Sequence, residues 1–534
     1  MKNKKTQSFA AGAAVLTIAA VIVKIIGALY KIPLGNILGE EGMGHFGVAY
    51  NIYNMLLTIS TAGLPVAMSK MVSEANAAGR PRQIRRIFTV AIITFTVLGV
   101  AGTSVMLFLN RKLAEVMKDT LASYSILALA PSVLFVCVMS AYRGYTQGHS
   151  NMTPSAISQV IEAVCKLVLG MACCWYLMKQ GFGYEYGAAG AIMGVTVGTI
   201  LGAVYLFSHV RRAGYADTSL VLDEPEPDGY GTILRRLIGI GIPITIGSSV
   251  LSIISLIDTN LVLRRLQSAA GFTEKAAVEL YGGYFNTQTL FNLPSSFITP
   301  MTISVIPSVT LMLVEGRRED CARLTRSALL VTTMFAMPAG IGLSVLSQPI
   351  LHLLYPGKPN LVTIGAPLLA ILGIASIFVC IVLLTNALLQ AYGKLYVPIV
   401  TMVIGGIIKI AVNWFLVGTP SINITGAPIG TLCCYGVIAL LNYIALAKYA
   451  PGRISIAKTF VKPLIASVIM GAACYGVYTL ALKAVNSSRI SVLIAIIAGV
   501  AVYLVAVIAL RVVTKEDLAV IPKGEKIAKL LHIR

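Results

Sequence analysis

The sequence predicts an all-α, polytopic membrane protein with about 14 transmembrane helices. Composition is the first observation behind this prediction: of the 534 residues, 57% are hydrophobic and only 12% are charged, whereas soluble chains carry about 25% charged residues. The second is the length of the apolar runs, because about 20 apolar residues suffice to cross a bilayer. The third is the position of the basic residues, which gather in the short segments between these runs.

Fourteen apolar runs follow one another along the chain. Their approximate ranges are 9–33, 44–73, 87–109, 121–142, 153–178, 187–209, 237–262, 281–313, 327–349, 361–389, 396–417, 426–447, 460–482 and 490–512. The run from 281 to 313 contains Pro294, Pro300 and Pro307. Proline lacks the backbone donor that a helix interior needs, so we expect a kinked or broken helix in this run.

The distribution of basic residues predicts that both termini are cytoplasmic. With the N-terminus inside, the inner segments hold 27 of the 42 Lys and Arg residues and the outer segments hold 11. The other four, Lys24, Lys70, Lys166 and Lys409, lie within apolar runs. Because Lys and Arg are retained in cytoplasmic loops, the net charge of +21 reflects topology, and we expect no nucleic-acid partner. The first run is too long for a signal peptide and shows no clear cleavage site.

An internal repeat relates the two halves of the chain. The runs at 44–73 and 281–313 both begin with alternating Tyr and Asn, reach a Leu-Pro pair, and lead to a loop in which an arginine follows a glycine by seven residues. A second echo places Lys166 twelve residues after Pro154 and Lys409 eleven residues after Pro398. Two six-helix lobes in parallel repeat would place a shared cavity between them.

The predicted domains are a six-helix lobe over residues 1–222, a pseudo-symmetric six-helix lobe over 223–455, and two further helices with a cytoplasmic tail over 456–534. The acidic, proline-bearing run Asp223–Asp228 is typical of a solvated linker. No phosphate-binding loop, Ser/His/Asp set or metal-ligand spacing occurs, and all but one of the nine cysteines lie in apolar runs. We therefore expect free thiols, no metal, no cofactor and no enzymatic activity.

Several stretches resemble the sporulation stage V protein B-like flippases of the multidrug/oligosaccharidyl-lipid/polysaccharide exporter superfamily. They are KIIGALYKIP at 24–33, GEEG at 39–42, LPVAMSKMVSE at 64–74, RGYTQG at 143–148 and MTPSAISQVIE at 152–162. The resemblance covers essentially the whole chain. It implies fourteen helices, two six-helix lobes around a cavity that opens alternately to either side, and a lipid-linked cell-wall precursor, lipid II in particular, as cargo. In the lipid II flippases two C-terminal helices form a groove for the lipid tail, a place that Phe460 to Val512 would fill here.

Two lysines in apolar runs are the main candidates for contact with a pyrophosphate. Lys24 lies about 22 Å from the inner edge of the first run, where it either lines a cavity or snorkels to the outer interface. Related lipid II flippases carry arginines near this position and near Lys31; lysine keeps the charge but not the bidentate geometry. Lys166 lies about 18 Å along its helix from Pro154. Glu162 precedes it by four residues, so the two share a helix face as a structural or a substrate-coupled pair.

Each of the remaining candidates has a structural interpretation beside the functional one. Lys31 at the edge of the first run is more typical of an interface anchor, and Arg143 and Arg264 are either phosphate contacts or ordinary flanking charges. Asn51 and Asn54 would bond either sugar hydroxyls or a neighbouring helix.

The resemblance also suggests an ion-coupling site. In some relatives an acid in the seventh span and polar groups in the eleventh bind sodium. Here Lys409 would replace that cation by pairing with Asp258, and Asn413 lies one turn beyond.

The sequence thus predicts a flippase that moves an undecaprenyl-pyrophosphate-linked saccharide from the inner to the outer leaflet of the bacterial cytoplasmic membrane. Its partners would be the lipid-linked substrate, the bilayer, and a monovalent cation or the membrane potential. Three alternatives stay open: a flippase for another lipid-linked polysaccharide, a multidrug cation antiporter of the same superfamily, and a non-transporting scaffold for wall or spore assembly. The antiporter would need acids rather than lysines at mid-membrane.

Overall fold

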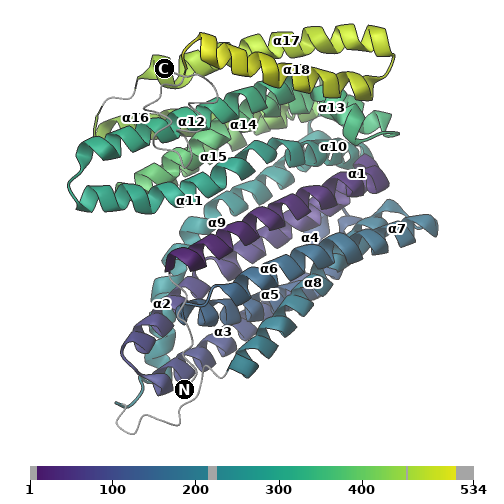
Figure 1. The fold of residues 1–534 in the computed structure, drawn as a ribbon. Coiled ribbons are helices and arrows are strands. Elements are labelled where there is room, and N and C mark those ends of the chain that lie inside the picture. The colour runs from purple at the N-terminus through teal and green to yellow at the C-terminus, as the bar shows by residue number, and fades with distance from the viewer. Residues whose placement is uncertain (1–8, 214–224, 453–454, 513–534) are drawn as a thin grey trace. The chain divides into compact units, whose positions relative to one another are not determined.

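The computed structural model describes residues 9–213, 225–452 and 455–512, which form helices joined by short turns (Figure 1). These residues contain no strand, which confirms the all-α class. The helices are α1 Phe9–Thr61, α2 Leu64–Ala77, α3 Pro81–Phe108, α4 Asn110–Val116, α5 Ala122–Gly148, α6 Thr153–Cys165, α7 Met171–Lys179, α8 Tyr184–Ala213, α9 Tyr230–Ser268, α10 Glu274–Phe291, α11 Leu293–Val314, α12 Arg318–Val345, α13 Ser347–Leu354, α14 Pro359–Ala391, α15 Tyr396–Leu416, α16 Gly426–Tyr449, α17 Lys462–Val485 and α18 Ser488–Ala509. Two π turns, Lys166–Gly170 and Ala457–Val461, precede α7 and α17.

Twelve helices of the described chain are long and apolar enough to cross a membrane, or thirteen if the bent helix α9 counts as one span. The predicted count of 14 is therefore close but not confirmed. One reason is that the segment Val15–Ala77 is counted once, although it contains the first two predicted spans. The predicted break in the run from 281 to 313 is confirmed, because α10 ends at Phe291 and α11 begins at Leu293.

Helix α1 folds back on itself at Gly39. This residue has φ 63° and ψ −159°, a conformation that glycine adopts far more readily than other residues. The rings of Tyr30 and Phe46 lie 6.1 Å apart, whereas sixteen residues of straight helix would separate them by about 24 Å. The two arms of α1, residues 9–38 and 40–61, therefore lie side by side.

The chain divides into two compact units, residues 1–267 with 272–282, and residues 268–271 with 283–534. In the first unit α5 is the central helix and packs against α1, α2, α3 and α8. In the second unit α14 packs against α11, α12, α13 and α16, and the α17–α18 hairpin packs against α12 and α13. The predicted domain limits at 222/223 and 455/456, which follow the internal repeat, stay a prediction.

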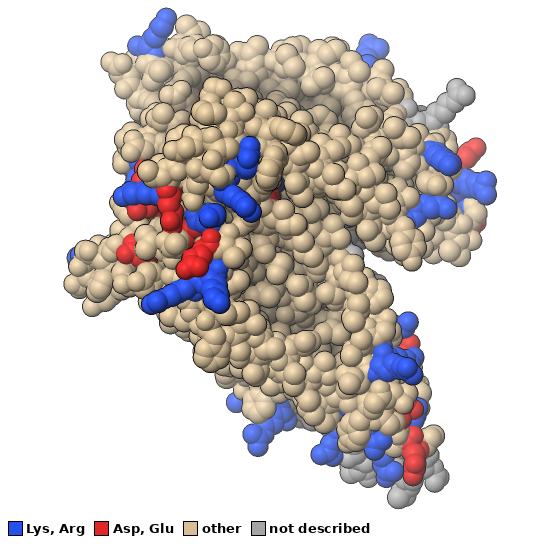
Figure 2. All heavy atoms as spheres, turned by 180° about the vertical axis from the view of Figure 1, so that it is seen from behind, with Lys and Arg blue, Asp and Glu red and all other residues tan. Residues whose placement is uncertain are grey.

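The surfaces of the helices suit a lipid environment. Large apolar side chains are exposed along α3, α15 and α18, as at Val97, Ile407 and Ile497. Figure 2 shows broad surfaces without charged side chains, and the Lys, Arg, Asp and Glu side chains on this face gather in separate groups. Apolar surface of this extent is unfavourable in water, so the chain is a multi-pass membrane protein. The termini predicted to be cytoplasmic lie outside the described residues.

The acidic run that was expected to form a free linker is anchored where it is described. Arg86 Nη1 donates to Pro227 O at 2.8 Å and to Asp228 O at 3.0 Å. Gln83 Nε2 donates to the Asp228 carboxylate at 2.9 Å. Asp223 and Glu224 lie outside the described residues. The rest of the run is thus fixed to the start of α3, by side chains that only the fold brings near it.

Candidate functional site

The first unit contains a polar cavity of about 580 Å³. Both arms of α1, the start of α2, and parts of α5, α6, the first π turn and α8 line it. Its charged lining residues are Lys24, Arg143, Glu162 and Lys166. Four of the predicted site residues, from three separate segments of the sequence, therefore meet at one cavity.

Lys166 is held by aromatic side chains from both arms of α1. Its Nζ donates to Tyr50 OH at 3.0 Å and lies 4.4 Å from the ring centroid of Tyr50 and 5.1 Å from that of Tyr30. Tyr30 is fixed in turn, because its OH donates to Ala191 O at 2.9 Å. Cation–π contacts stabilise an ammonium group away from water. Lys166 keeps two further N–H donors that a ligand in the cavity could use.

Glu162 pairs with Arg143 rather than with Lys166. Nη2 of Arg143 lies 3.4 Å from Glu162 Oε2, and Tyr53 OH donates to Glu162 Oε1 at 3.4 Å. The predicted Glu162–Lys166 pair is missing from the ion pairs of the described residues, and the lysine amine donates to Tyr50 OH. The π turn that begins at Lys166 is a feature often found at functional sites.

Lys24 lines the same cavity from the first arm of α1. This position agrees with its interpretation as a cavity cation, and its contact with substrate stays a prediction. Lys31 is not among the lining residues, and its Nζ lies 5.1 Å from the ring centroid of Tyr50. Lys31 therefore contacts the cavity wall through that ring.

The two predicted asparagines lie outside the cavity lining. Asn51 Nδ2 donates to Thr259 Oγ1 at 2.9 Å and to Tyr281 OH at 2.8 Å, so this side chain bonds neighbouring helices, which is the second of the two interpretations given above. Asn54 is half-buried on the same arm of α1.

The other predicted site residues are not brought to this cavity. Arg264 is exposed on α9, and Asp258 is buried on the same helix, both in the first unit. Lys409 and Asn413 lie on α15 in the second unit. The ion-coupling pair of Asp258 with Lys409 would join the two units and stays a prediction.

Sequence reasoning missed the aromatic lining of Tyr30, Tyr50 and Tyr53. Tyr50 and Tyr53 are three residues apart and so share a helix face, a signal that the Tyr/Asn alternation already displayed. Tyr30 approaches Lys166 from the first arm of α1 only because the helix turns at Gly39. The glycine itself is the only sign of this turn in the sequence.

All nine cysteines are free thiols, as expected. Among the described residues no group of three or more His, Cys, Asp or Glu side chains is placed to hold a metal ion.

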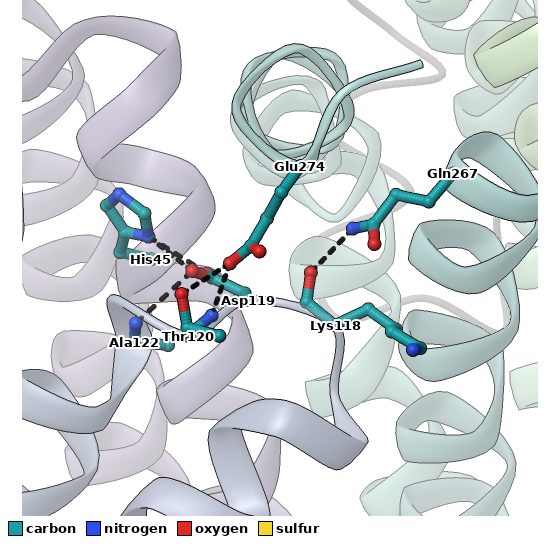
Figure 3. Close-up of polar contacts among 7 residues, drawn as sticks. All are labelled: His45, Lys118, Asp119, Thr120, Ala122, Gln267 and Glu274. Carbon is teal, nitrogen blue, oxygen red and sulfur yellow. Dashed lines mark hydrogen bonds and ion pairs between the residues drawn. The ribbon is translucent and has the colours of Figure 1, made fainter. Parts of the chain in front are cut away.

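A second polar cluster, at the loop between α4 and α5, was also missed (Figure 3). His45 Nδ1 lies 2.7 and 2.9 Å from the two carboxylate oxygens of Asp119, and these residues are only 3% and 0% exposed. Asp119 also accepts a hydrogen bond from Ala122 N at 3.2 Å. The pair therefore fixes the start of α5 to the second arm of α1.

The same loop is tied to α9 and α10 (Figure 3). The backbone N and the Oγ1 of Thr120 both donate to Glu274 Oε1 at 2.6 Å, and Gln267 Nε2 donates to Lys118 O at 2.6 Å. Lys275, the residue after Glu274, forms a hydrogen bond with Glu41, and this bond raises the pKa of the Lys275 amine. These contacts join the α4–α5 loop to α9 and α10, and α10 to α1, within the first unit.

Asp119→Ala is expected to lower the free energy of unfolding by about 1–3 kcal/mol, because it leaves the buried Nδ1 of His45 without its hydrogen-bond partner. Asp119→Asn keeps an acceptor and should lose less. Thermal unfolding of the purified protein in detergent would measure the effect. Asp320→Ala, which removes an exposed partner of Arg317, is the control and should change little. Equal melting temperatures for Asp119→Ala and the unmodified protein would contradict the prediction.

The second unit contains an apolar groove of about 1090 Å³. It is lined by α12, α14, α16, the π turn Ala457–Val461 and α17, with Tyr443, Phe460 and Tyr475 among its aromatic residues. A separate apolar pocket of about 460 Å³ lies between α11, α12, α13, α17 and α18. Of the two C-terminal helices, α17 lines both hollows and α18 only the smaller one.

Comparison with known proteins gives consistent likenesses. The family described as "Polysaccharide biosynthesis protein" matches residues 9–312. "Stage V sporulation protein B" of Bacillus subtilis (strain 168) is 26% identical over 464 residues, which cover 84% of this chain and 86% of that protein. "Lipid II flippase MurJ" of the same organism is 26% identical over 479 residues, covering 86% and 87%.

A solved structure shares the fold. "Lipid II flippase MurJ, inward closed conformation" matches with a TM-score of 0.71 at 16% identity, covering 93% of this chain and 99% of that one. The observed arrangement of helices is therefore the fold of that solved protein.

Proposed function

Because the chain belongs to the polysaccharide biosynthesis protein family, whose match spans residues 9–312, we propose that it is a flippase for an undecaprenyl-pyrophosphate-linked saccharide. The cargo would be a cell-wall precursor, lipid II in the first instance, carried from the inner to the outer leaflet by alternating access. The name of one relative, "Lipid II flippase MurJ", supports the class of cargo, and the cavity of the first unit supports its charge.

The excess of positive charge in that cavity carries the proposal. Lys24, Arg143 and Lys166 contribute three formal positive charges against the single negative charge of Glu162. Unbalanced charge within a membrane is costly, so the cavity favours a ligand that supplies the missing negative charges. A pyrophosphate diester carries two of them, whereas a cationic drug would add to the imbalance.

The donors that face the cavity suit a phosphate with a sugar beside it. Arg143 offers the planar fork that binds phosphate oxygens in pairs, and Lys166 offers a compact ammonium group. Ser140, Gln147 and Gln159 add hydroxyl and amide groups to the lining, which are suited to sugar hydroxyls.

The apolar groove of the second unit supports the expected place of the lipid tail. Seven of its lining residues come from the segment 456–475, which includes the first part of α17. A polyprenyl chain binds apolar surface without needing polar partners. The tail would therefore run along α17, with α18 supporting that helix from its other side.

Reconstitution into lipid vesicles tests the proposed cargo. Fluorescent lipid II should change leaflets, as measured with a membrane-impermeant quencher, and unlabelled lipid II should compete. A teichoic-type lipid-linked precursor as the competitor distinguishes the first alternative cargo. Transport of a cationic drug without any movement of lipid-linked saccharide would contradict the proposal.

Gly27→Trp is expected to reduce flipping to the level of protein-free vesicles. Gly27 lines the cavity, and a Cβ placed there meets no atom within 4 Å, so the indole would fill the cavity without displacing the backbone. Gly239→Trp on α9 is a matched control, because its Cβ also meets nothing within 4 Å and it does not line the cavity. Equal loss of flipping in both variants would argue against a role for the cavity.

A further inference from the structure

Glu162 is the only carboxylate among the described residues that line the cavity, and it is loosely held. Its contacts with Arg143 Nη2 and Tyr53 OH are both 3.4 Å long, whereas charge-assisted N–H···O bonds are typically about 2.7–2.9 Å. Its side chain is 21% exposed. The carboxylate could therefore leave Arg143 without breaking a short bond.

Arg143 is fixed independently of Glu162. Its Nε donates to Ser158 Oγ at 2.9 Å, and the hydroxyl of this fully buried serine donates to Ser155 O at 2.8 Å. The serine proton is thus engaged elsewhere, and its oxygen is oriented to accept from the arginine. If Glu162 moved away, the guanidinium would stay in place with its Nη donors available at the cavity.

We propose that Glu162 is a resident counterion, which the phosphate of the cargo displaces from Arg143. The inference rests on the proposed function of this cavity. In the empty cavity the carboxylate balances part of the charge of the guanidinium. An entering diphosphate, which carries more charge, takes its place. When the cargo departs, the carboxylate returns to Arg143 and competes with the phosphate for it.

This exchange makes Glu162 a specificity-determining residue. An anion with no more charge than a carboxylate gains little by replacing it, whereas a diphosphate gains more, so discrimination comes from competition inside the site. The same competition keeps binding weak enough for release, which any transport site requires.

Glu162→Gln is expected to lower the Kd for lipid II about tenfold, because it removes the competing charge while it keeps the size and an acceptor for Tyr53. KM and kcat for flipping should fall together, since release becomes slow. If Glu162 only supported Arg143, Glu162→Gln would instead raise the Kd for lipid II.

Two further variants sharpen the test. Ser158→Ala frees the guanidinium and should raise Kd, the opposite direction to Glu162→Gln. Glu162→Asp keeps the charge but reaches less far toward Arg143, so its Kd should fall by a smaller factor. Calorimetry measures the binding of lipid II and of inorganic pyrophosphate to the full-length protein in detergent. Flipping of lipid II is measured separately, in vesicles.

The outcomes separate the two proposals. Tighter binding by Glu162→Gln and by Glu162→Asp, with weaker binding by Ser158→Ala, supports the counterion role. Unchanged or weaker binding by both Glu162 variants overturns that role while the proposed function stands. Failure of the unmodified protein to bind either probe overturns the proposed use of the cavity, and the counterion inference falls with it.

Discussion

Replacing Lys166 with methionine is expected to reduce flipping by about 10- to 100-fold, because a hydrogen bond to a charged group contributes on the order of 1.5–3 kcal/mol. Methionine keeps the length of the side chain and its contact with the rings of Tyr30 and Tyr50 but loses the charge and the two N–H donors left for a ligand. Initial rates of lipid II flipping in vesicles would measure the loss, at matched amounts of folded protein.

The control is Lys179→Met. Lys179 also lies over an aromatic ring, 4.8 Å from the centroid of Trp175, but it does not line the cavity, so flipping should persist. Tyr50→Phe gives an intermediate test, because it removes the hydroxyl that binds Lys166 and keeps the ring. Full activity of Lys166→Met would remove this lysine from the substrate site.

Gly436→Trp is expected to abolish flipping by blocking the groove for the lipid tail. Gly436 lines the groove on α16, and a Cβ placed there meets no atom within 4 Å. The indole should therefore occupy the groove rather than the core. Binding of inorganic pyrophosphate, which has no tail, should be unchanged, and calorimetry on the detergent-solubilised protein would measure it.

The matched control is Gly476→Trp on α17. Its Cβ also meets nothing within 4 Å, and Gly476 does not line the groove. Loss of lipid II flipping in Gly436→Trp but not in Gly476→Trp would tie the groove to the tail. Full flipping by Gly436→Trp would place the tail elsewhere.

The helices were largely predictable because each apolar run must satisfy its backbone hydrogen bonds within itself inside a membrane. Even the break between α10 and α11 was foreseen, since Pro294 is the second residue of α11. The predicted number of spans was less secure. Helix α1 and the bent helix α9 show why. In α1, the turn at Gly39 changes the path of the chain while hardly interrupting its helical hydrogen bonds.

The candidate site was predictable as a set of charges but not as a set of contacts. Lys24, Arg143, Glu162 and Lys166 were all candidates, since a charge in an apolar run needs a reason. The partner of Glu162 was not predictable, because helical spacing pointed to Lys166. Sequence spacing reports which residues share a face and gives no information on a competing side chain from another helix, such as Tyr50.

By itself the sequence determined that this chain is a helical membrane protein, and its charged residues indicated where a site would be sought. The tertiary structure decided that four of these residues share one cavity in the first unit, that Arg143 holds Glu162, and that His45 and Asp119 form a buried pair. The physical reason is the range of the forces. Helix formation in a membrane depends on local hydrogen bonds and hydropathy. The pairing of these charges depends on side chains that lie 19 and 74 residues apart in the sequence and meet only when the helices pack.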